Sequence, residues 1–215
     1  MNLPFPTIAI TRIILIAALK LVATGCLIGL LHRHDLVIAC ILATYIAWRC
    51  KSELTPNGKM NVILVSGMVC TALYGSATEL WGIRNNHWTY HDLSDGRTFP
   101  YWLPLAWALS FYFMYRLERQ ILTLLKPTVF TKFIIFFLVA LIFPVIGEIV
   151  TIALGVWDYH WPWKIAGVPI LAMVGLIALH MPVNGIFLIL CKVFRLNDPV
   201  FSLSPAEKST QGTDR

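Results

Sequence analysis

The chain has 215 residues, of which 58% are hydrophobic and 13% charged, and its mean hydropathy is +0.72. A soluble domain carries roughly 25% charged residues, so this composition excludes an ordinary soluble protein. The formal net charge is +6, but no basic run has the density or the interleaved aromatic residues of a nucleic-acid interface, and no nucleic-acid partner is expected.

Six apolar segments follow one another along the chain and predict an all-α fold, a polytopic membrane helix bundle. Most of them approach the roughly 20 residues that cross a hydrocarbon core, and lipid offers no hydrogen-bond partner to an open strand edge. The segments lie at about residues 8–31, 36–50, 61–83, 99–117, 130–156 and 167–191. The N-terminus lacks the features of a cleaved secretory signal, so we expect the first helix to be retained.

The Lys and Arg residues lie mostly in the second and fourth connections and after the last segment. Because positive charge concentrates on the cytoplasmic side of membrane proteins, this bias predicts that both termini lie inside. We expect an integral, multi-pass protein of the bacterial plasma membrane. Residues 1–195 then form a single transmembrane domain, and the polar residues 196–215 form a disordered cytoplasmic tail.

One phrase occurs twice in the chain, 69 residues apart. "ELWGIRNNHWTYH" begins at Glu79, "EIVTIALGVWDYH" begins at Glu148, and each copy reaches a proline nine residues after its histidine. We interpret the phrases as an internal repeat of two helical hairpins, with units at about residues 61–118 and 130–190. The alternative is a chance match, because Trp and Tyr are enriched at membrane interfaces in any case.

The glutamate of each copy is the leading candidate for a functional group. Trp157 is expected to mark the outer interface, so Glu148 would lie about 13 Å further in, close to the bilayer centre. Glu79 is expected to be shallower, because the polar residues 84–86 indicate an earlier helix end. An ionisable group at such depth is a functional candidate by default, whereas a structural pair with Lys20 or a hydrogen bond to another helix is the alternative.

A carboxyl group in apolar surroundings can stay protonated near pH 7 and donate its proton. Such an acid can protonate a carbon–carbon double bond, and aromatic ring faces can then shield the carbocation through cation–π attraction. The candidate catalytic residues are the glutamate, tyrosine and histidine of both copies: Glu148, Glu79, Tyr159, Tyr90, His160 and His91. The candidate substrate-binding residues are aromatic or polar side chains in or beside the spans: Trp157, Trp88, Trp81, Trp102, Tyr112, His180 and Asn184. For the last two, a hydrogen bond between helices is the alternative.

The phrase "EIVTIALGVWDYHWPWKIAGVPI" resembles the repeated unit of the integral-membrane lycopene cyclases of the heterodimeric type, in which an acid in a helix is followed by G-[IV]-W-x-[YF], a glycine and a proline. "ELWGI" also looks like the E-x-x-G-I/V phrase of the related carotenoid hydratases. The resemblance covers about residues 61–190. The matching residues are Glu148, Gly155, Trp157, Tyr159, Gly167 and Pro169 in the second copy and Glu79, Trp88, Tyr90 and Pro100 in the first.

The resemblance implies a membrane enzyme of carotenoid biosynthesis. Its substrate would be a hydrophobic polyene or terpenoid, its reaction an acid-initiated cyclisation, hydration or isomerisation, and its class an isomerase or a lyase without a cofactor. In the cyclases the proline leads into an acidic P-x-E phrase. Here residues 170–172 (ILA) follow Pro169 and residues 101–103 (YWL) follow Pro100, so the resemblance extends to the architecture and not to lycopene as the substrate.

Two further patterns in the loops have simpler interpretations. His87, His91 and His160 lie near several aspartates, but the loop context favours solvated histidines, and no metal site is predicted. The run DLSD at residues 92–95 lacks the second acidic cluster of a magnesium–diphosphate site, and SDGR predicts a turn.

Two other functions remain open from the sequence. The duplicated glutamates would also suit a small proton- or ion-coupled transporter, since parallel repeats occur among transporters. A non-catalytic membrane assembly subunit is the third possibility. The expected partners are the polyene or terpenoid, membrane lipid, and further subunits in a homo- or hetero-oligomer.

Overall fold

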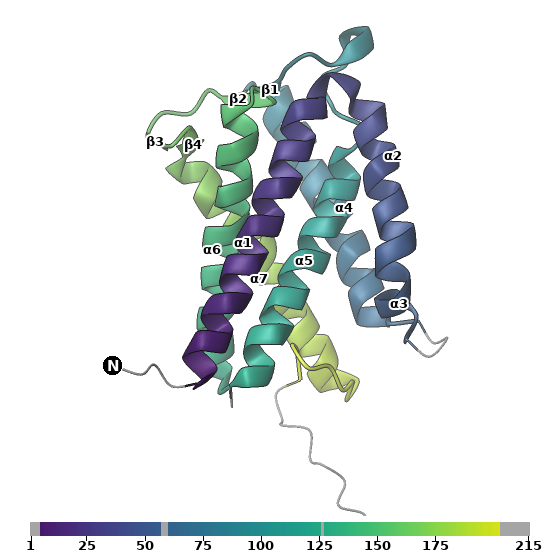
Figure 1. Cartoon of the computed structure of the whole chain (residues 1–215), viewed down its shortest axis with the longest axis vertical. Helices are drawn as coiled ribbons and strands as arrows, with labels where there is room; N and C mark the ends of the chain where they lie inside the picture. The colour runs from purple at the N-terminus through teal and green to yellow at the C-terminus, as the bar shows by residue number, and fades with distance from the viewer. Residues whose placement is uncertain (1–4, 57–59, 126, 203–215) are drawn as a thin grey trace, which may run out of the picture.

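Long helices run up and down between the two ends of a bundle in the computed structural model, which describes residues 5–56, 60–125 and 127–202 (Figure 1). The long helices are α1 (Phe5–Leu31), α2 (Asp35–Tyr45, continued by a π-helical turn at Ile46–Cys50), α4 (Val62–Arg84), α5 (Leu103–Leu124), α6 (Val129–Ala153) and α7 (Ile170–Val193). The short elements are α3 (Lys51–Leu54), β1 (Trp88–Tyr90), β2 (Trp157–Tyr159), β3 (Lys164–Ile165) and β4 (Val168–Pro169). We call the end that carries β1 and β2 the ribbon end, and the opposite end the tail end.

Within the described residues, four helical segments are long and apolar enough to cross a membrane, by length and composition: Thr7–Trp48, Val62–Arg84, Val129–Ala153 and Ile170–Val193. The first of these contains both α1 and α2, which are joined by a 3₁₀ turn at His32–His34. The predicted segment 99–117 corresponds to α5, which extends to Leu124 and takes up the charged residues of "YRLERQ". These charges lower its hydropathy, so α5 is not among the four. The mostly helical class is confirmed, and the two short β-ribbons are additions to it.

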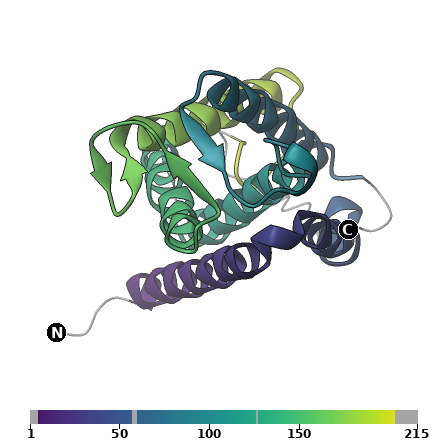
Figure 2. The ribbon, with the colours of Figure 1, turned by 90° about the horizontal axis from the view of Figure 1, so that it is seen from above.

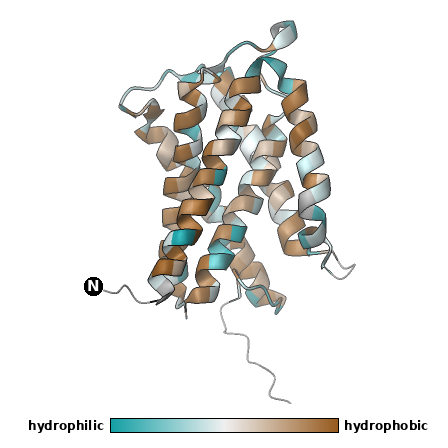
Figure 3. Cartoon of the chain, viewed as in Figure 1, coloured by the Kyte–Doolittle hydropathy of each residue, from teal (hydrophilic) through white to brown (hydrophobic). Residues whose placement is uncertain are grey.

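Helices α4, α5, α6 and α7 close into a four-helix group, in which each helix contacts the next and α7 contacts α4. Figure 2 shows α1 and α2 along one side of this group. Helix α1 packs closely on α6 through its glycines: a Cβ atom at Gly29 would lie 2.3 Å from the Leu154 side chain. Small residues allow helix backbones to approach in this way. Hydrophobic residues cover most of the helices, and hydrophilic residues gather towards the ends (Figure 3).

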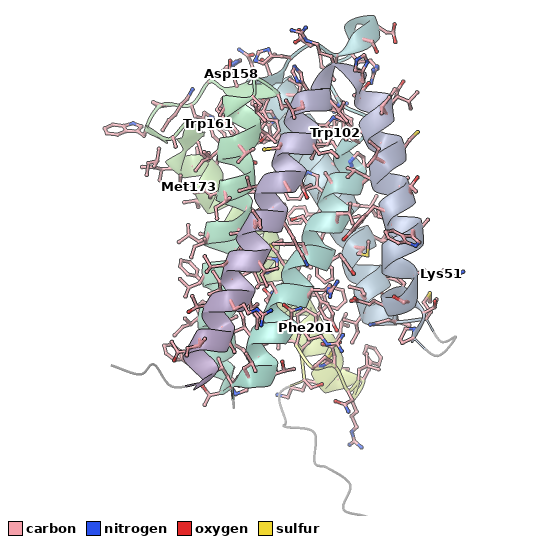
Figure 4. All side chains as sticks on the ribbon, viewed as in Figure 1. Lys51, Trp102, Asp158, Trp161, Met173 and Phe201 are labelled. Carbon is pink, nitrogen blue, oxygen red and sulfur yellow. The ribbon has the colours of Figure 1, made fainter. Side chains whose placement is uncertain are left out.

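The chain after α7 folds back onto the tail end of the bundle. Val200 and Phe201 are fully buried, and Asp198 accepts hydrogen bonds from the Val200 N–H (2.8 Å) and the Tyr115 hydroxyl (2.8 Å). The Lys132 ammonium donates to the Val200 carbonyl oxygen at 2.8 Å. Figure 4 shows Phe201 at this position. The predicted disorder from residue 196 is therefore wrong for residues 198–202, because two apolar residues follow an aspartate that caps their backbone. Residues 203–215 lie outside the described residues.

Replacing Phe201 with Ala is expected to lower the free energy of unfolding by about 3–5 kcal/mol, because it leaves a cavity between α5, α6 and α7. Denaturant unfolding of the purified protein in detergent measures the loss. Phe194→Ala is the matched control, since that side chain is 65% exposed. Equal losses in the two variants would show that the chain after α7 does not stabilise the bundle.

Candidate active site at the ribbon end

Helices α4 and α6 end with the same backbone motif. In α4 the N–H groups of Asn86 and His87 donate to carbonyl oxygens three and five residues earlier, at 3.0 and 2.9 Å. The N–H groups of Gly155 and Val156 repeat this pattern in α6, at 2.9 and 3.1 Å. Asn86 and Gly155 have positive φ angles of 54° and 75°, the left-handed conformation that closes a helix and favours Gly or Asn. The chain therefore turns out of α4 and out of α6 in the same way.

The two phrases then pair with each other as the antiparallel strands β1 and β2. Trp88 lies opposite Tyr159, Tyr90 lies opposite Trp157, and Thr89 lies opposite Asp158 at the centre. An offset of 69 residues exchanges the two outer pairs and maps the central pair onto itself, so the pairing is symmetric about its centre. The backbone bonds from His91 to Val156 (3.0 Å) and from His160 to His87 (2.8 Å) extend the same symmetry.

Each glutamate is held by an aromatic side chain from the strand that follows its own helix. The Tyr90 hydroxyl donates to Glu79 Oε2 at 3.0 Å, and the Trp88 Nε1–H donates to the same oxygen at 2.8 Å. The Tyr159 hydroxyl donates to Glu148 Oε2 at 2.8 Å. Burial and the nearby carboxyl groups raise the pKa of both tyrosines well above its usual value, so both remain hydrogen-bond donors. The bonds to the two glutamates thus come from their own phrases, and neither forms an ion pair with Lys20.

The two glutamates stand equally far from the ends of their helices. Glu79 and Glu148 each stand five residues before the end of their helix, which corresponds to about 7.5 Å. The predicted depth of about 13 Å for Glu148 assumed that α6 continues as a helix to Trp157, and it is wrong because the helix ends at Ala153. The prediction that Glu79 is shallower is wrong for the same reason, since the left-handed residue follows both helix ends at the same position.

Both glutamates line one large, mainly apolar cavity of about 1330 Å³ between α1, α2, α5 and α6. Its lining follows α5 from Trp102 to Leu124, a distance of roughly 30 Å at 1.5 Å per residue. The aromatic side chains around the carboxyl groups are Tyr90, Trp102, Trp107 and Trp157. Trp102 is 2% exposed, and its Nε1–H has no hydrogen-bond partner in the described residues. Figure 4 shows Trp102 at the ribbon end, in the region between α1 and α2.

The structure brings together some of the predicted site residues and separates others. Those that line the cavity are Glu79, Glu148, Tyr90, Trp157, Trp102 and Tyr112. Tyr159 donates a hydrogen bond to Glu148 and Trp88 donates one to Glu79, but neither residue lines the cavity. His91 contacts Asp158, His160 contacts Thr89, and Trp81 is 52% exposed, so these three lie apart from the carboxyl groups. Alternation accounts for the two histidines, since the residue after an inward-facing tyrosine points outward. Trp81 lies in α4 two residues after Glu79, on a different face of the helix.

His180 and Asn184 do not reach the cavity, because Glu118 of α5 binds them both. His180 Nε2 lies 2.7 Å from Glu118 Oε1, and Asn184 Nδ2 donates to the same oxygen at 3.1 Å. All three side chains are buried between α5 and α7. The pair that was predicted to bind substrate therefore does not line this cavity, and the structure shows the alternative contact, hydrogen bonding between helices. Sequence reasoning missed Glu118 because it lies in a charged run that was assigned to a connection.

The loop residues have other contacts. Among the described residues, no group of three or more His, Cys, Asp and Glu side chains could hold a metal ion. His87 accepts a hydrogen bond from Trp161 Nε1 at 3.0 Å. His32 and Arg33 bind Asp92 and lower the pKa of its carboxyl group. The predicted turn is confirmed as a 3₁₀ turn at Ser94–Gly96.

The loop that leads into α5 is fixed by a partly buried ion pair. Arg97 donates to both oxygens of Asp35 at the start of α2, at 2.7 and 3.0 Å. The Tyr101 N–H donates to the same carboxylate at 3.2 Å, one residue before Trp102. The pair therefore holds Trp102 in the cavity wall.

Replacing Gly82 with Ala is expected to destabilise the site, because a Cβ atom there would lie 1.9 Å from the Trp88 ring. The Trp88 indole would have to leave Glu79, at a cost of about 1–3 kcal/mol. Near-ultraviolet circular dichroism and thermal unfolding in detergent measure the change. Gly175→Ala is the matched control, since nothing lies within 4 Å of its added Cβ. A Gly82→Ala variant that behaves like this control would contradict the described contact.

The fold and the site together define a class: a helical bundle with helices long enough to cross a membrane, around an elongated apolar cavity that holds two carboxyl groups tied to aromatic donors. Comparisons with protein-family models, with curated proteins and with solved structures found no match to this chain. The functional argument therefore rests on the site itself.

Proposed function

We propose that this chain is an integral membrane enzyme that acts on a hydrophobic polyene or terpenoid by acid-initiated cyclisation, hydration or isomerisation. One observation carries the proposal: Glu79 and Glu148 meet at the ribbon end of one elongated apolar cavity. Such a cavity can admit a long unsaturated chain and exclude most water from it. The carboxyl groups are then the groups placed to give and take protons.

The hydrogen bonds suggest a division of roles between the two carboxyl groups. Trp88 and Tyr90 both donate to Glu79, at 2.8 and 3.0 Å, whereas Tyr159 donates to Glu148 at 2.8 Å and Trp157 contributes only a weaker hydrogen bond. Hydrogen bonds to a carboxylate stabilise its negative charge. We therefore assign Glu79 as the base and Glu148 as the proton donor.

In this scheme the Glu148 O–H protonates one carbon of a double bond, and the other carbon becomes a cation. A neighbouring double bond attacks the cation to close a ring, or a water molecule adds to it. Glu79 takes up the proton that the product cation or the added water releases. Cyclisation leaves the composition of the substrate unchanged, because one proton is added and one is removed. Hydration adds one water molecule to it. A proton passing from Glu79 back to Glu148 restores the starting state.

The aromatic lining suits a cationic intermediate. Trp102, Trp107 and Trp157 line the same part of the cavity as the carboxyl groups. An aromatic face attracts a cation by about 0.5–2 kcal/mol, with the larger values in desolvated sites. Several such faces lower the energy of the cation without offering it a nucleophile.

The proposal includes the topology predicted from the sequence: six spans, both termini inside, and the ribbon end outside the plasma membrane of a bacterium. Helix α5 would cross the membrane in addition to the other five long helices, and its charged second half would lie at the cytoplasmic face. The matching contacts 69 residues apart support an internal duplication of the hairpins α4–α5 and α6–α7. The resemblance to lycopene cyclases and carotenoid hydratases supports the same assignment, because Glu79, Tyr90, Glu148 and Tyr159 are among its matching residues.

Mass spectrometry of the lipid-soluble molecules retained after purification in mild detergent tests this function. We expect an unsaturated isoprenoid, and incubation with that molecule should yield an isomer or a product heavier by one water. Retention of ordinary phospholipid alone, with no conversion of any polyene offered, would overturn the proposal. Proton flux into proteoliposomes that depends on Glu79 and Glu148 would favour the transporter instead.

A further inference from the structure

The charged residues that line the cavity are unevenly distributed. The two acids, Glu79 and Glu148, lie at the ribbon end, and the cations are Arg12, Lys20 and Arg116. Gln120 lines the cavity near the tail end as well. Figure 3 shows the corresponding hydrophilic stretches in the lower parts of α1 and α5, which are otherwise hydrophobic. Among the described lining residues, the part of the cavity below the two glutamates therefore contains cations and no acid, and Glu53, outside the lining, pairs with Arg116.

Packing between the helices places these residues along the cavity. Leu21 lies beside Gly147 and Gly25 beside Val150, and α1 and α6 run in the same direction. Glu148 is therefore level with about residue 22 of α1, and Arg12 lies about ten residues lower, roughly 15 Å away along the axis. Ala17 packs with Met114, Leu117 and Ile121 of the antiparallel α5. On this register Gln120 lies about two residues above Arg12 and Arg116 about six residues above it, roughly 9 Å along the axis. Lys20 lies close to the level of Arg116, and all these residues lie below the level of Glu148.

Arg12 has no acidic partner in the described part of the chain. It stands seven residues inside α1, about 10 Å from the first residue of the helix. A cation at such a position in an apolar helix is costly unless a counter-charge or water meets it. Arg116 donates to the Tyr112 hydroxyl at 3.2 Å and pairs with Glu53 at 3.3 Å, and its guanidinium has further N–H groups.

We infer that the cavity takes its substrate as an amphiphile, an isoprenoid chain that ends in a phosphate or diphosphate group held by Arg12, Arg116 and Gln120. Guanidinium groups match the geometry of phosphate oxygens and bind them through paired N–H donors. The chain would extend from this head group towards the ribbon end, so that a double bond a few isoprene units away lies at Glu148. This inference rests on the proposed function for the site of reaction. The phosphate ester itself is not broken, because the acid acts at the other end of the chain.

Binding of four probes to the full-length protein in detergent tests the inference: farnesyl diphosphate, farnesyl monophosphate, farnesol and phosphatidylglycerol. Quenching of tryptophan fluorescence reports occupancy, since three tryptophans lie around the carboxyl groups. We expect at least one farnesyl phosphate to bind more than about tenfold tighter than farnesol, which corresponds to about 1.4 kcal/mol. Whichever phosphate binds more tightly identifies the head group.

The variant Arg12→Gln/Arg116→Gln should bring the phosphates and farnesol to within about threefold of each other. Arg119→Gln/Lys192→Gln is the matched control, because it removes the same charge at the same end of the bundle from residues that do not line the cavity. Size-exclusion chromatography and circular dichroism confirm that each variant is folded. The single variants Arg12→Gln and Arg116→Gln replace the double variant if it does not fold.

Three results would overturn the inference: equal binding of farnesol and both phosphates by the native protein, an unchanged preference in the cavity variants, or displacement of the phosphate by an equal concentration of phosphatidylglycerol. The last result would identify a general lipid surface. Glu148→Gln should keep the preference, because that carboxyl group is not among the groups that hold the head group in this inference. A preserved preference without any turnover of the bound phosphate would remove the proposed reaction and leave the head-group site, so the two failures can be distinguished.

Discussion

Replacing Glu148 with Gln is expected to reduce turnover of the isoprenoid by roughly 10²–10⁴-fold, the usual contribution of general acid catalysis. Glutamine has nearly the same shape, and its carbonyl oxygen can still accept the hydrogen bond from Tyr159. The amide cannot act as a proton donor of useful acidity, so the first step fails while the bundle remains folded. Single-turnover conversion of the bound substrate, followed by chromatography, measures the loss.

Glu118→Gln is the control, because Glu118 is also a buried acid but does not line the cavity. Its contact with His180 holds α5 to α7, so this variant should lose stability. Turnover per folded molecule should remain close to that of the native protein. If Glu118→Gln loses turnover as strongly as Glu148→Gln, or if Glu148→Gln remains active, Glu148 is not the acid.

The repeated phrase singled out the two glutamates that line the cavity, but it did not predict how they are held. The spacing from Glu79 to Tyr90 equals that from Glu148 to Tyr159, and this equality was the available signal for the two hydrogen bonds. The bonds form only because the chain turns back after α4 at Asn86 and after α6 at Gly155. These turns bring each tyrosine to the glutamate of the preceding helix. Counting residues along an uninterrupted helix from Trp157 therefore placed Glu148 too far from that residue.

Other features depended on contacts between distant segments, which periodicity does not reveal. Strands β1 and β2 have three residues each and pair across 69 positions, too short to show the alternation of a strand. The contact of Glu118 could not be predicted, because a polar residue in a helix gives the same sequence pattern whether it faces water or a histidine on the neighbouring helix. Phe201 was assigned to a disordered tail because residues 196–215 are polar on average. In the structure, Asp198 binds its backbone and the Tyr115 hydroxyl, and these contacts fix its position.

The helices themselves were more predictable, because long apolar runs leave few alternatives. All six predicted segments coincide with long helices, and the largest error is at α5, where the predicted end at residue 117 falls seven residues short. That error had a physical cause: Arg116 and Glu118 find partners inside the bundle, so charge does not end the helix there.

Replacing Glu79 with Gln is expected to slow turnover by roughly 10²-fold and to change the products. The substrate is still protonated by Glu148, but the cation has no base to take its proton, so a larger share should be captured by water or return to substrate. The ratio of hydrated to cyclised or isomerised product, measured by mass spectrometry, should therefore rise.

Tyr90→Phe is the control: it removes one hydrogen bond from Glu79 and leaves the carboxyl group, so a loss of only about tenfold is expected. The double variant Glu79→Gln/Glu148→Gln should be no slower than Glu148→Gln alone, because residues that act in one sequence of proton transfers are not additive. An unchanged product ratio in Glu79→Gln would assign the base to another group.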